Sequence, residues 1–481
     1  MASNDFLLRL CRTLSPSEQS HFVRHLRQHK AKRDSKLLQL FQLAVKQCKG
    51  QVTDYRDASS GFLRPGNFPA VRNQLYHKLL RFLALEVEQS RRAEASRMVD
   101  ELHLLINRGL LQEARKLASR AQAYAEKYQL HSLQLEIALL QRRLFRQFAT
   151  QELPESLEES RALSARCLQQ LQEEMRLHDH YERLYLHKRL GQHAELQRAL
   201  QAPEEPASEL QSTEARIYYY FARRLKASHE RDREAELHYS QKVVEEFEQH
   251  HSLSDHLPRY FRAVNNLINS CFRMGQLGEA YQLIRRVQEV EPANFYQQAQ
   301  LHSLTMSTGI IYYFLTGQTQ VVRRNAPEYE QLLQQYGAFI PQERYLEISY
   351  NTAVAFLYEN EYGGCLQWVN RCLSQRDNRE FREERVNARI GRGTETRAIV
   401  LRLIAFRELG QDQLLRRFLQ PAFQYFEKHA PPNVQVLQGV LQYLRQELRA
   451  QPVKKEERLG LLQQLQAQPG LEEFSGWLQA R

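Results

Sequence analysis

The sequence predicts an all-α protein, a right-handed α-solenoid of about eight antiparallel helical hairpins with helical caps at both ends. Glycine recurs between amphipathic helical stretches at intervals of 42 to 47 residues, or at about twice that interval. A fixed repeat of this size is typical of stacked helical hairpins. Good helix formers such as Leu, Gln, Arg, Glu and Ala are frequent, whereas the 481 residues include only 19 Gly and 15 Pro. The repeating glycines are Gly109, Gly191, Gly275, Gly317, Gly363 and Gly410.

Two wide intervals, from Gly109 to Gly191 and from there to Gly275, predict further turns without glycine near Thr150 and Asp232. Each glycine is expected to end the first helix of its hairpin, because glycine readily adopts the left-handed conformation found there. A small or apolar residue five places later then lets the second helix pack on the first. Those residues are Ala114, Ala280, Val322, Trp368 and Leu415.

The clearest hairpin covers residues 259–292 and turns at Gly275. Apolar side chains of its first helix recur every three or four residues, which places them on one helix face. We assign residues 91–432 to the hairpin array, and residues 433–481 to a C-terminal helical cap that covers the last apolar face. Three further segments repeat the plan of the clearest hairpin: 93–129, 345–375 and 394–429.

The composition argues against a membrane-spanning or disulfide-stabilised protein. The first apolar stretch, residues 6–8, is followed by Arg9 and Arg12, so no export signal is expected. No apolar run approaches the roughly 20 residues that a membrane helix needs. The cysteines show no paired-ligand spacing, which favours reduced, buried thiols in a cytoplasmic protein over disulfides or a zinc site. They are Cys11, Cys48, Cys167, Cys271, Cys365 and Cys372.

The net charge of +11 is concentrated in residues 1–81. These hold 15 Lys and Arg against 5 Asp and Glu, a net of +10, while the remaining 400 residues hold 52 against 51, a net of +1. Such asymmetry points to a binding partner rather than to a fold. We therefore assign residues 1–90 to a basic helical N-terminal module.

Within this module, Ser15 and Glu18 form a capping-box pattern that predicts a helix running to about His29. Residues 50–69 break the helical pattern, and a strong helix follows from Val71. A turn-like break at 58–61, between a helix and the Val71 helix, predicts a helix-turn-helix that would contact DNA. The alternative is a solvated cap, or a surface for an acidic partner. In either binding case the candidate contacts are Arg24, Arg27, Lys30, Arg72 and Lys78.

Two turns carry a motif that resembles the tetratricopeptide-like helical repeats: Gly109-x-Leu111-x-Glu113-Ala114 and Gly275-x-Leu277-x-Glu279-Ala280. The whole chain also resembles a group of bacterial helical-repeat proteins, without assigned activity, that place a short helical cap ahead of the array. That likeness rests on the opening Leu14 to Phe22, the Leu75 to Leu83 helix and the ending Phe474 to Leu478. The resemblance implies a fold and no activity.

In tetratricopeptide-like hairpins the first helix lines a concave groove at positions 13, 9 and 6 residues before the turn. The resemblance therefore implies Arg262, Asn266 and Asn269, counted from Gly275. Counted from the turn inferred at Asp232, it implies Tyr219, Arg223 and Lys226. Each triplet falls on one helix face, where Arg and Asn would hold a carboxylate and a peptide backbone. An ordinary solvent-facing stripe is the alternative.

No phosphate-binding glycine loop, nucleophile elbow or zinc-protease pattern is present, so we expect no enzyme activity and no cofactor. His21, His25 and His29 share a helix face, but Arg24 and Arg27 beside them would repel a metal ion. We predict a cytoplasmic scaffold that binds a partner peptide or helix in the solenoid groove. The alternative is a regulator that binds nucleic acid through residues 1–81 and uses the solenoid as a sensor.

Overall fold

The structure, a computed structural model, is all-helical, and the residues that it describes contain no β-strand. The all-α prediction is therefore confirmed for that part of the chain. None of these helices is long and apolar enough to cross a membrane. The described residues are 5–28, 32–48, 50–86, 90–145, 153–201, 207–249, 256–292, 294–374, 390–429, 433–449, 455–468 and 471–479.

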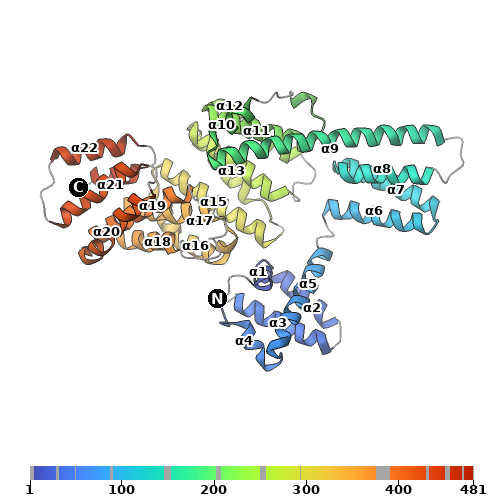
Figure 1. The fold of residues 1–481 in the computed structure, drawn as a ribbon, viewed down its shortest axis with the longest axis horizontal. Helices are drawn as coiled ribbons and strands as arrows, with labels where there is room; N and C mark the ends of the chain where they lie inside the picture. Colours follow the sequence, from blue (N-terminus) through green and yellow to red (C-terminus); the bar gives the residue numbers. More distant parts are fainter. Residues whose placement is uncertain are drawn as a thin grey trace. The chain divides into compact units, whose positions relative to one another are not determined.

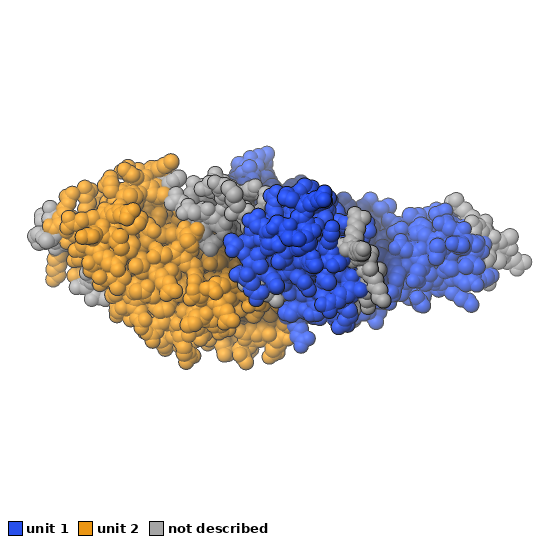
Figure 2. Space-filling model, turned by 90° about the horizontal axis from the view of Figure 1, so that it is seen from below, with its two compact units in different colours: residues 1–274, 291–297 blue, residues 275–290, 298–481 orange. Residues whose placement is uncertain are grey.

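The chain forms two compact units, which are coloured separately in Figure 2. Unit 1 contains residues 1–274 and 291–297, and unit 2 contains residues 275–290 and 298–481. In both units, helices that follow one another in sequence pack against each other. The division falls inside the hairpin array predicted for residues 91–432.

Unit 1 begins with a bundle of five helices, drawn in blue in Figure 1. Their apolar faces enclose one core, where the Phe22 ring lies 4.9 Å from Phe41 and 5.1 Å from Phe82. These three rings tie the second, third and fifth helices together. The helices are α1 (Phe6–Arg12), α2 (Pro16–Gln28), α3 (Lys32–Cys48), α4 (Tyr55–Ala58) and α5 (Phe68–Glu86).

The start of α2 follows the predicted capping box. The backbone N–H of Ser15 donates to Glu18 Oε2 (2.6 Å), and the backbone N–H of Glu18 donates to Ser15 Oγ (3.2 Å). The predicted break at 50–69 holds α4 and two short 3-10 turns. A helix-turn-helix joins two full helices through a short turn, whereas α4 is a single turn of four residues. Residues 55–86 therefore differ from that motif.

Three helices with a separate core follow: α6 (Arg91–Asn107), α7 (Leu111–Lys127) and α8 (His131–Phe145). Alanines at three- and four-residue spacing form the buried face of α7, which lets its neighbours approach closely. The turns that bound α7 have positive φ, 73° at Gly109 and 52° at Gln129. The first of these turns was predicted from its glycine.

The helix α9 (Leu153–Leu190) is 38 residues long and packs on three helices, α8, α10 and α11 (Figure 1). In its first half Ser160 Oγ donates to the carbonyl of Ala138 in α8 (3.0 Å). In its second half the ring of Tyr181 lies 5.3 Å from Phe221 in the later helix α11. The short helix α10 (His193–Leu200) follows the Gly191 turn. The turn predicted near Thr150 lies outside the described residues.

Unit 1 continues with α11 (Thr213–Glu230), α12 (Arg233–Gln249) and α13 (Leu257–Arg273). The turn predicted near Asp232 is confirmed, because Arg231 adopts the left-handed conformation with φ 62°. Asp232 then caps α12, since its carboxylate accepts a hydrogen bond from the backbone N–H of Ala235 (2.9 Å). At the helix starts that follow Gly109, Gly191, Gly275 and Gly317, by contrast, no side chain caps the helix.

In unit 2, the helices α16, α18, α19 and α23 (Glu472–Gln479) all lie against α17. Ten of its residues are buried, including Tyr350 and Thr352. This helix is therefore the centre of the unit 2 core. The helices ahead of the C-terminal cap are α14 (Leu277–Gln288), α15 (Phe295–Leu315), α16 (Thr319–Tyr336), α17 (Gln342–Tyr358), α18 (Tyr362–Ser374), α19 (Ile390–Glu408) and α20 (Asp412–His429).

The turns predicted at the repeating glycines are confirmed at five of the six positions. Gly109, Gly191, Gly275, Gly317 and Gly410 all have φ between 66° and 73° and end a helix. The turn assigned to Gly363 was wrong, because Asn360 takes the left-handed conformation (φ 58°) and Gly363 lies inside α18. Asn tolerates this conformation better than other residues with a side chain, so no glycine is required there.

The predicted C-terminal segment 433–481 contains three helices, α21 (Val434–Leu448), α22 (Lys455–Gln466) and α23 (Glu472–Gln479). The last of them packs on α17, where Tyr350 Oη donates a hydrogen bond to the buried carboxylate of Glu473. Trp477 Nε1 donates to Glu408 Oε1 (2.9 Å) in α19. The chain end thus closes over the core of unit 2.

Candidate functional site

The residues predicted to line a groove lie on two helices of unit 1, α11 and α13. These helices meet at Arg259, whose Nη1 donates to Glu214 Oε1 (2.5 Å) and whose guanidinium stands 4.9 Å from the Tyr218 ring. All six predicted residues are at least partly exposed, so none is a core residue. They are Tyr219, Arg223 and Lys226 on α11, and Arg262, Asn266 and Asn269 on α13.

The α11 triplet is partly engaged by the neighbouring helix α12. Arg223 Nη2 donates to Tyr239 Oη (2.8 Å), and the guanidinium lies 5.1 Å from the centre of the same ring. Tyr219 packs edge-on against Tyr220, whose ring in turn stacks on Tyr239. These contacts fix the orientation of the Arg223 side chain and occupy part of the guanidinium that a ligand would otherwise bind.

The α13 triplet is different. Within the described part of the chain, no hydrogen bond or ion pair involves the side chains of Arg262, Asn266 or Asn269. Arg262 is exposed, and the two asparagines are half-buried. Together they offer a guanidinium and two amides, which can bind a carboxylate and the polar groups of a peptide backbone. This triplet is the better binding surface of the two.

A buried ion-pair cluster holds α11, α12 and α13 in place behind these residues. Glu236 of α12 accepts from Arg224 of α11 (3.4 Å) and from Arg273 of α13 (2.8 Å). The Glu236 side chain is 6% exposed and that of Arg224 12%. Burial lowers the pKa of Arg224, and the adjacent carboxylate opposes this shift. The cluster fixes the three helices, because each charge loses its partner if they separate.

The N-terminal module contains a groove of about 740 Å³ between α2 and α3. The groove brings together Arg24 and Arg27, which the sequence analysis selected, with Lys46, which it did not. All three cations are exposed, and no carboxylate is found among the described residues that line the groove. The described residues that line it are Pro16, Gln19, Ser20, Val23, Arg24, Arg27, Phe41, Gln42, Val45, Lys46 and Gln51.

The other predicted contacts of this module do not line the groove. Arg72 of α5 forms an ion pair with Asp5 (3.3 Å), and its guanidinium lies 4.5 Å from the Phe6 ring. It therefore stabilises the bundle by holding the chain start on α5. Lys78 lies on the same helix and is partly exposed. Lys30 lies outside the described residues.

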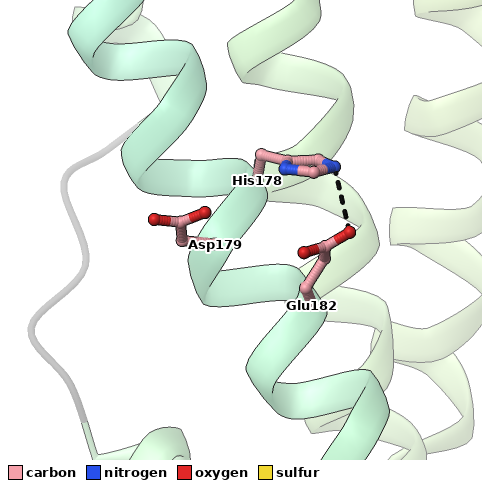
Figure 3. A group of neighbouring side chains, drawn as sticks. All are labelled: His178, Asp179 and Glu182. Atoms are coloured by element: carbon pink, nitrogen blue, oxygen red, sulfur yellow. Dashed lines mark ion pairs between the residues drawn. The ribbon is translucent and has the colours of Figure 1, made fainter.

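One group of described residues on α9 brings three ligand atoms within 4.8 Å of one another, namely His178, Asp179 and Glu182. Figure 3 shows His178 paired with Glu182 one helical turn away, with Nε2 and Oε1 3.3 Å apart. The imidazole also packs against the Tyr218 ring at 4.5 Å. Asp179 and Glu182 are exposed, as expected for a solvated helix face, and we assign no metal to them.

The cysteines do not form a reactive site. All six are free, and five are buried. Burial raises the pKa of Cys365 and of Cys372 to about 12, so both thiols stay protonated at neutral pH. Because the thiolate is the nucleophile, these residues are unsuited to covalent catalysis.

No protein-family model and no curated protein matches the chain. Its function is therefore inferred from the surfaces on α2, α3, α11 and α13.

Proposed function

We propose that this protein is a cytoplasmic, non-enzymatic scaffold that binds a peptide or helix of a partner protein. In this proposal residues 91–432 form a right-handed, tetratricopeptide-like α-solenoid of about eight hairpins, with helical caps formed by residues 1–90 and 433–481. The binding surface is the face of α11 and α13 that carries the two triplets. Arrays of this type recognise extended peptides and helices through such faces.

The observation that carries this proposal is the polar α13 triplet. Arg262, Asn266 and Asn269 share one face and have no polar partner in the described part of the chain. The helices behind them are fixed by the Glu236 cluster, so a ligand meets a surface that is already ordered. Preorganisation of this kind improves affinity because less conformational freedom is lost on binding.

The experiment is affinity capture by the full-length protein, compared with a variant in which Arg262, Asn266 and Asn269 are all changed to Ala. We expect at least one partner to be lost with this variant and retained by a matched control. The control changes three exposed polar residues of α7 to Ala. Equal partner sets for the wild type and the α13 variant would refute binding at this face. The control residues are Gln112, Lys116 and Arg120.

A second function, nucleic-acid binding through residues 1–81, is supported by the cations of the N-terminal groove. Arg24, Arg27 and Lys46 have no ion-pair partner within the described residues. Binding to phosphates would weaken steeply as salt rises, because each contact releases counterions. A gel-shift titration of the full-length protein with duplex DNA and with single-stranded RNA over a range of salt tests this function. Absence of a shift at low salt would end it.

A further inference from the structure

We propose that the groove between α2 and α3 binds an acidic amphipathic segment of a partner protein. This site is separate from the α11 and α13 face, and the proposal gives the cations considered above for nucleic-acid binding a protein partner instead. The groove combines a cationic rim with an apolar floor, and each part fits a different half of such a segment. Arg24, Arg27 and Lys46 form the rim, while Val23 and Val45 contribute to the floor.

Charge complementarity defines the sign of the partner. Arg24 and Arg27 are three residues apart on α2, and therefore on the same side of it. Lys46 faces the groove from α3. In contrast to the arginines of the Glu236 cluster, these cations have no carboxylate partner in the described part of the chain. Carboxylates at three- or four-residue spacing on a bound helix would neutralise them.

The floor favours a peptide over nucleic acid. Single-stranded nucleic acid binds by stacking its bases on exposed aromatic rings. Phe41, the one aromatic residue among the described residues of the groove, is only 1% exposed and packs into the bundle core, so it offers no stacking surface. Val23 and Val45 are half-buried aliphatic side chains that can cover leucine-like groups of a ligand.

Glutamine amides supply the remaining recognition. Gln19, Gln42 and Gln51 line the groove beside the cations. An amide can donate and accept, so it can satisfy both polar groups of a peptide backbone. The side-chain amide of Gln19 already donates to the Leu14 carbonyl (3.0 Å), which fixes its direction. The groove is thus built for a ligand with backbone polar groups, acidic side chains and a few apolar ones.

The test uses the full-length protein and a fluorescent synthetic peptide of about 14 residues, with Glu on one helix face and Leu on the opposite face. Anisotropy titrations compare the wild type with a variant that changes Arg24, Arg27 and Lys46 to Glu. We expect affinity to fall at least about tenfold. A control variant changes three exposed cations outside the groove to Glu, and we expect less than about a threefold loss because only long-range attraction changes. The control residues are Lys36, Arg64 and Arg81.

Two further measurements test the apolar floor of the groove and its independence from the α13 triplet. A peptide with Ser in place of Leu should bind at least about fivefold more weakly, and Val45→Gln should abolish this preference without loss of helicity. The α13 triplet variant should bind the probe as the wild type does, which separates this site from the array. Any of three results overturns the proposal: no binding of the Glu-Leu peptide at low salt, equal losses in both charge variants, or tighter groove-dependent binding of a single-stranded DNA oligonucleotide.

Discussion

The buried Glu236 cluster makes the sharpest stability prediction. Glu236→Leu removes the only carboxylate that pairs with Arg224 in the described residues, and it also removes the partner of Arg273. Removal of one partner from a buried ion pair typically costs about 3–5 kcal/mol, because the other charge stays desolvated. Arg273 is 46% exposed and can be rehydrated, whereas Arg224 is 12% exposed and cannot. We therefore expect a loss at the lower end, about 3 kcal/mol.

Scanning calorimetry of the full-length protein measures this loss. In a unit of this size, 1 kcal/mol lowers Tm by about 2–4 °C, so Glu236→Leu should lower the Tm of the unit 1 transition by about 6–12 °C. Arg224→Met combined with Glu236→Leu should recover most of the loss, because buried pairs are often replaced by apolar side chains without penalty. The control is Glu245→Leu on the same helix, which breaks an exposed pair with Lys242 and should change stability by less than about 1 kcal/mol.

Two results would refute the reasoning. If Glu236→Leu is no more destabilising than Glu245→Leu, Arg224 is not a desolvated charge. If the double variant is as unstable as Glu236→Leu alone, the loss comes from packing and not from an unpaired guanidinium. A loss that shrinks strongly at high salt would also count against burial, because buried pairs are screened weakly.

Adjacent glycines of α18 should respond to alanine in opposite directions: Gly363→Ala meets open space in a helix and should stabilise by about 0.5–1 kcal/mol. Gly364→Ala would make the new Cβ overlap the Phe356 ring and should destabilise by about 1–3 kcal/mol, and urea unfolding of both variants checks the pair. Burial raises the pKa of Glu473 above its unfolded value of about 4.3, so stability should fall as pH rises through the window between the two values. Glu473→Gln keeps an acceptor for Tyr350 and should flatten the dependence of Tm on pH above about 4, and an unchanged slope would contradict this assignment.

Turns could be predicted where the sequence uses glycine, and less well elsewhere. Gln129, Arg231 and Asn360 all adopt positive φ without being glycine. For such residues the left-handed conformation is unfavourable by roughly 1–2 kcal/mol, which packing of the flanking helices must offset. That packing depends on both helices, so the left-handed conformation of such a residue cannot be predicted from its residue type alone. At Asn360 the nearby Gly363 was the more conspicuous signal and led to the wrong residue.

The sequence indicates which candidate residues share a helix face, but it does not indicate which side chains contact one another. The α13 triplet, chosen by counting back from Gly275, consists of residues that are at least partly exposed. The sequence did not show that Arg223 is held by Tyr239, because this contact depends on the rotation of α12 against α11. Lys46 was missed for the same reason: 19 residues separate it from Arg27, and only the packing of α3 on α2 brings both to one groove. The charge count identifies the basic N-terminal module, whereas the groove between α2 and α3 is identified only from the fold.

Net charge alone overstates how much of the N-terminal module is available to a partner. Arg72 contributes to the +10 of residues 1–81, yet it pairs with Asp5 and packs on Phe6, so it serves the bundle. In the remaining chain nearly equal numbers of cations and anions allow pairing such as that of Arg224 with Glu236. The groove cations differ from both cases, because the described chain supplies no carboxylate for them. Unpaired charge at one place, rather than total charge, is therefore what distinguishes the α2 and α3 groove as a site for an acidic ligand.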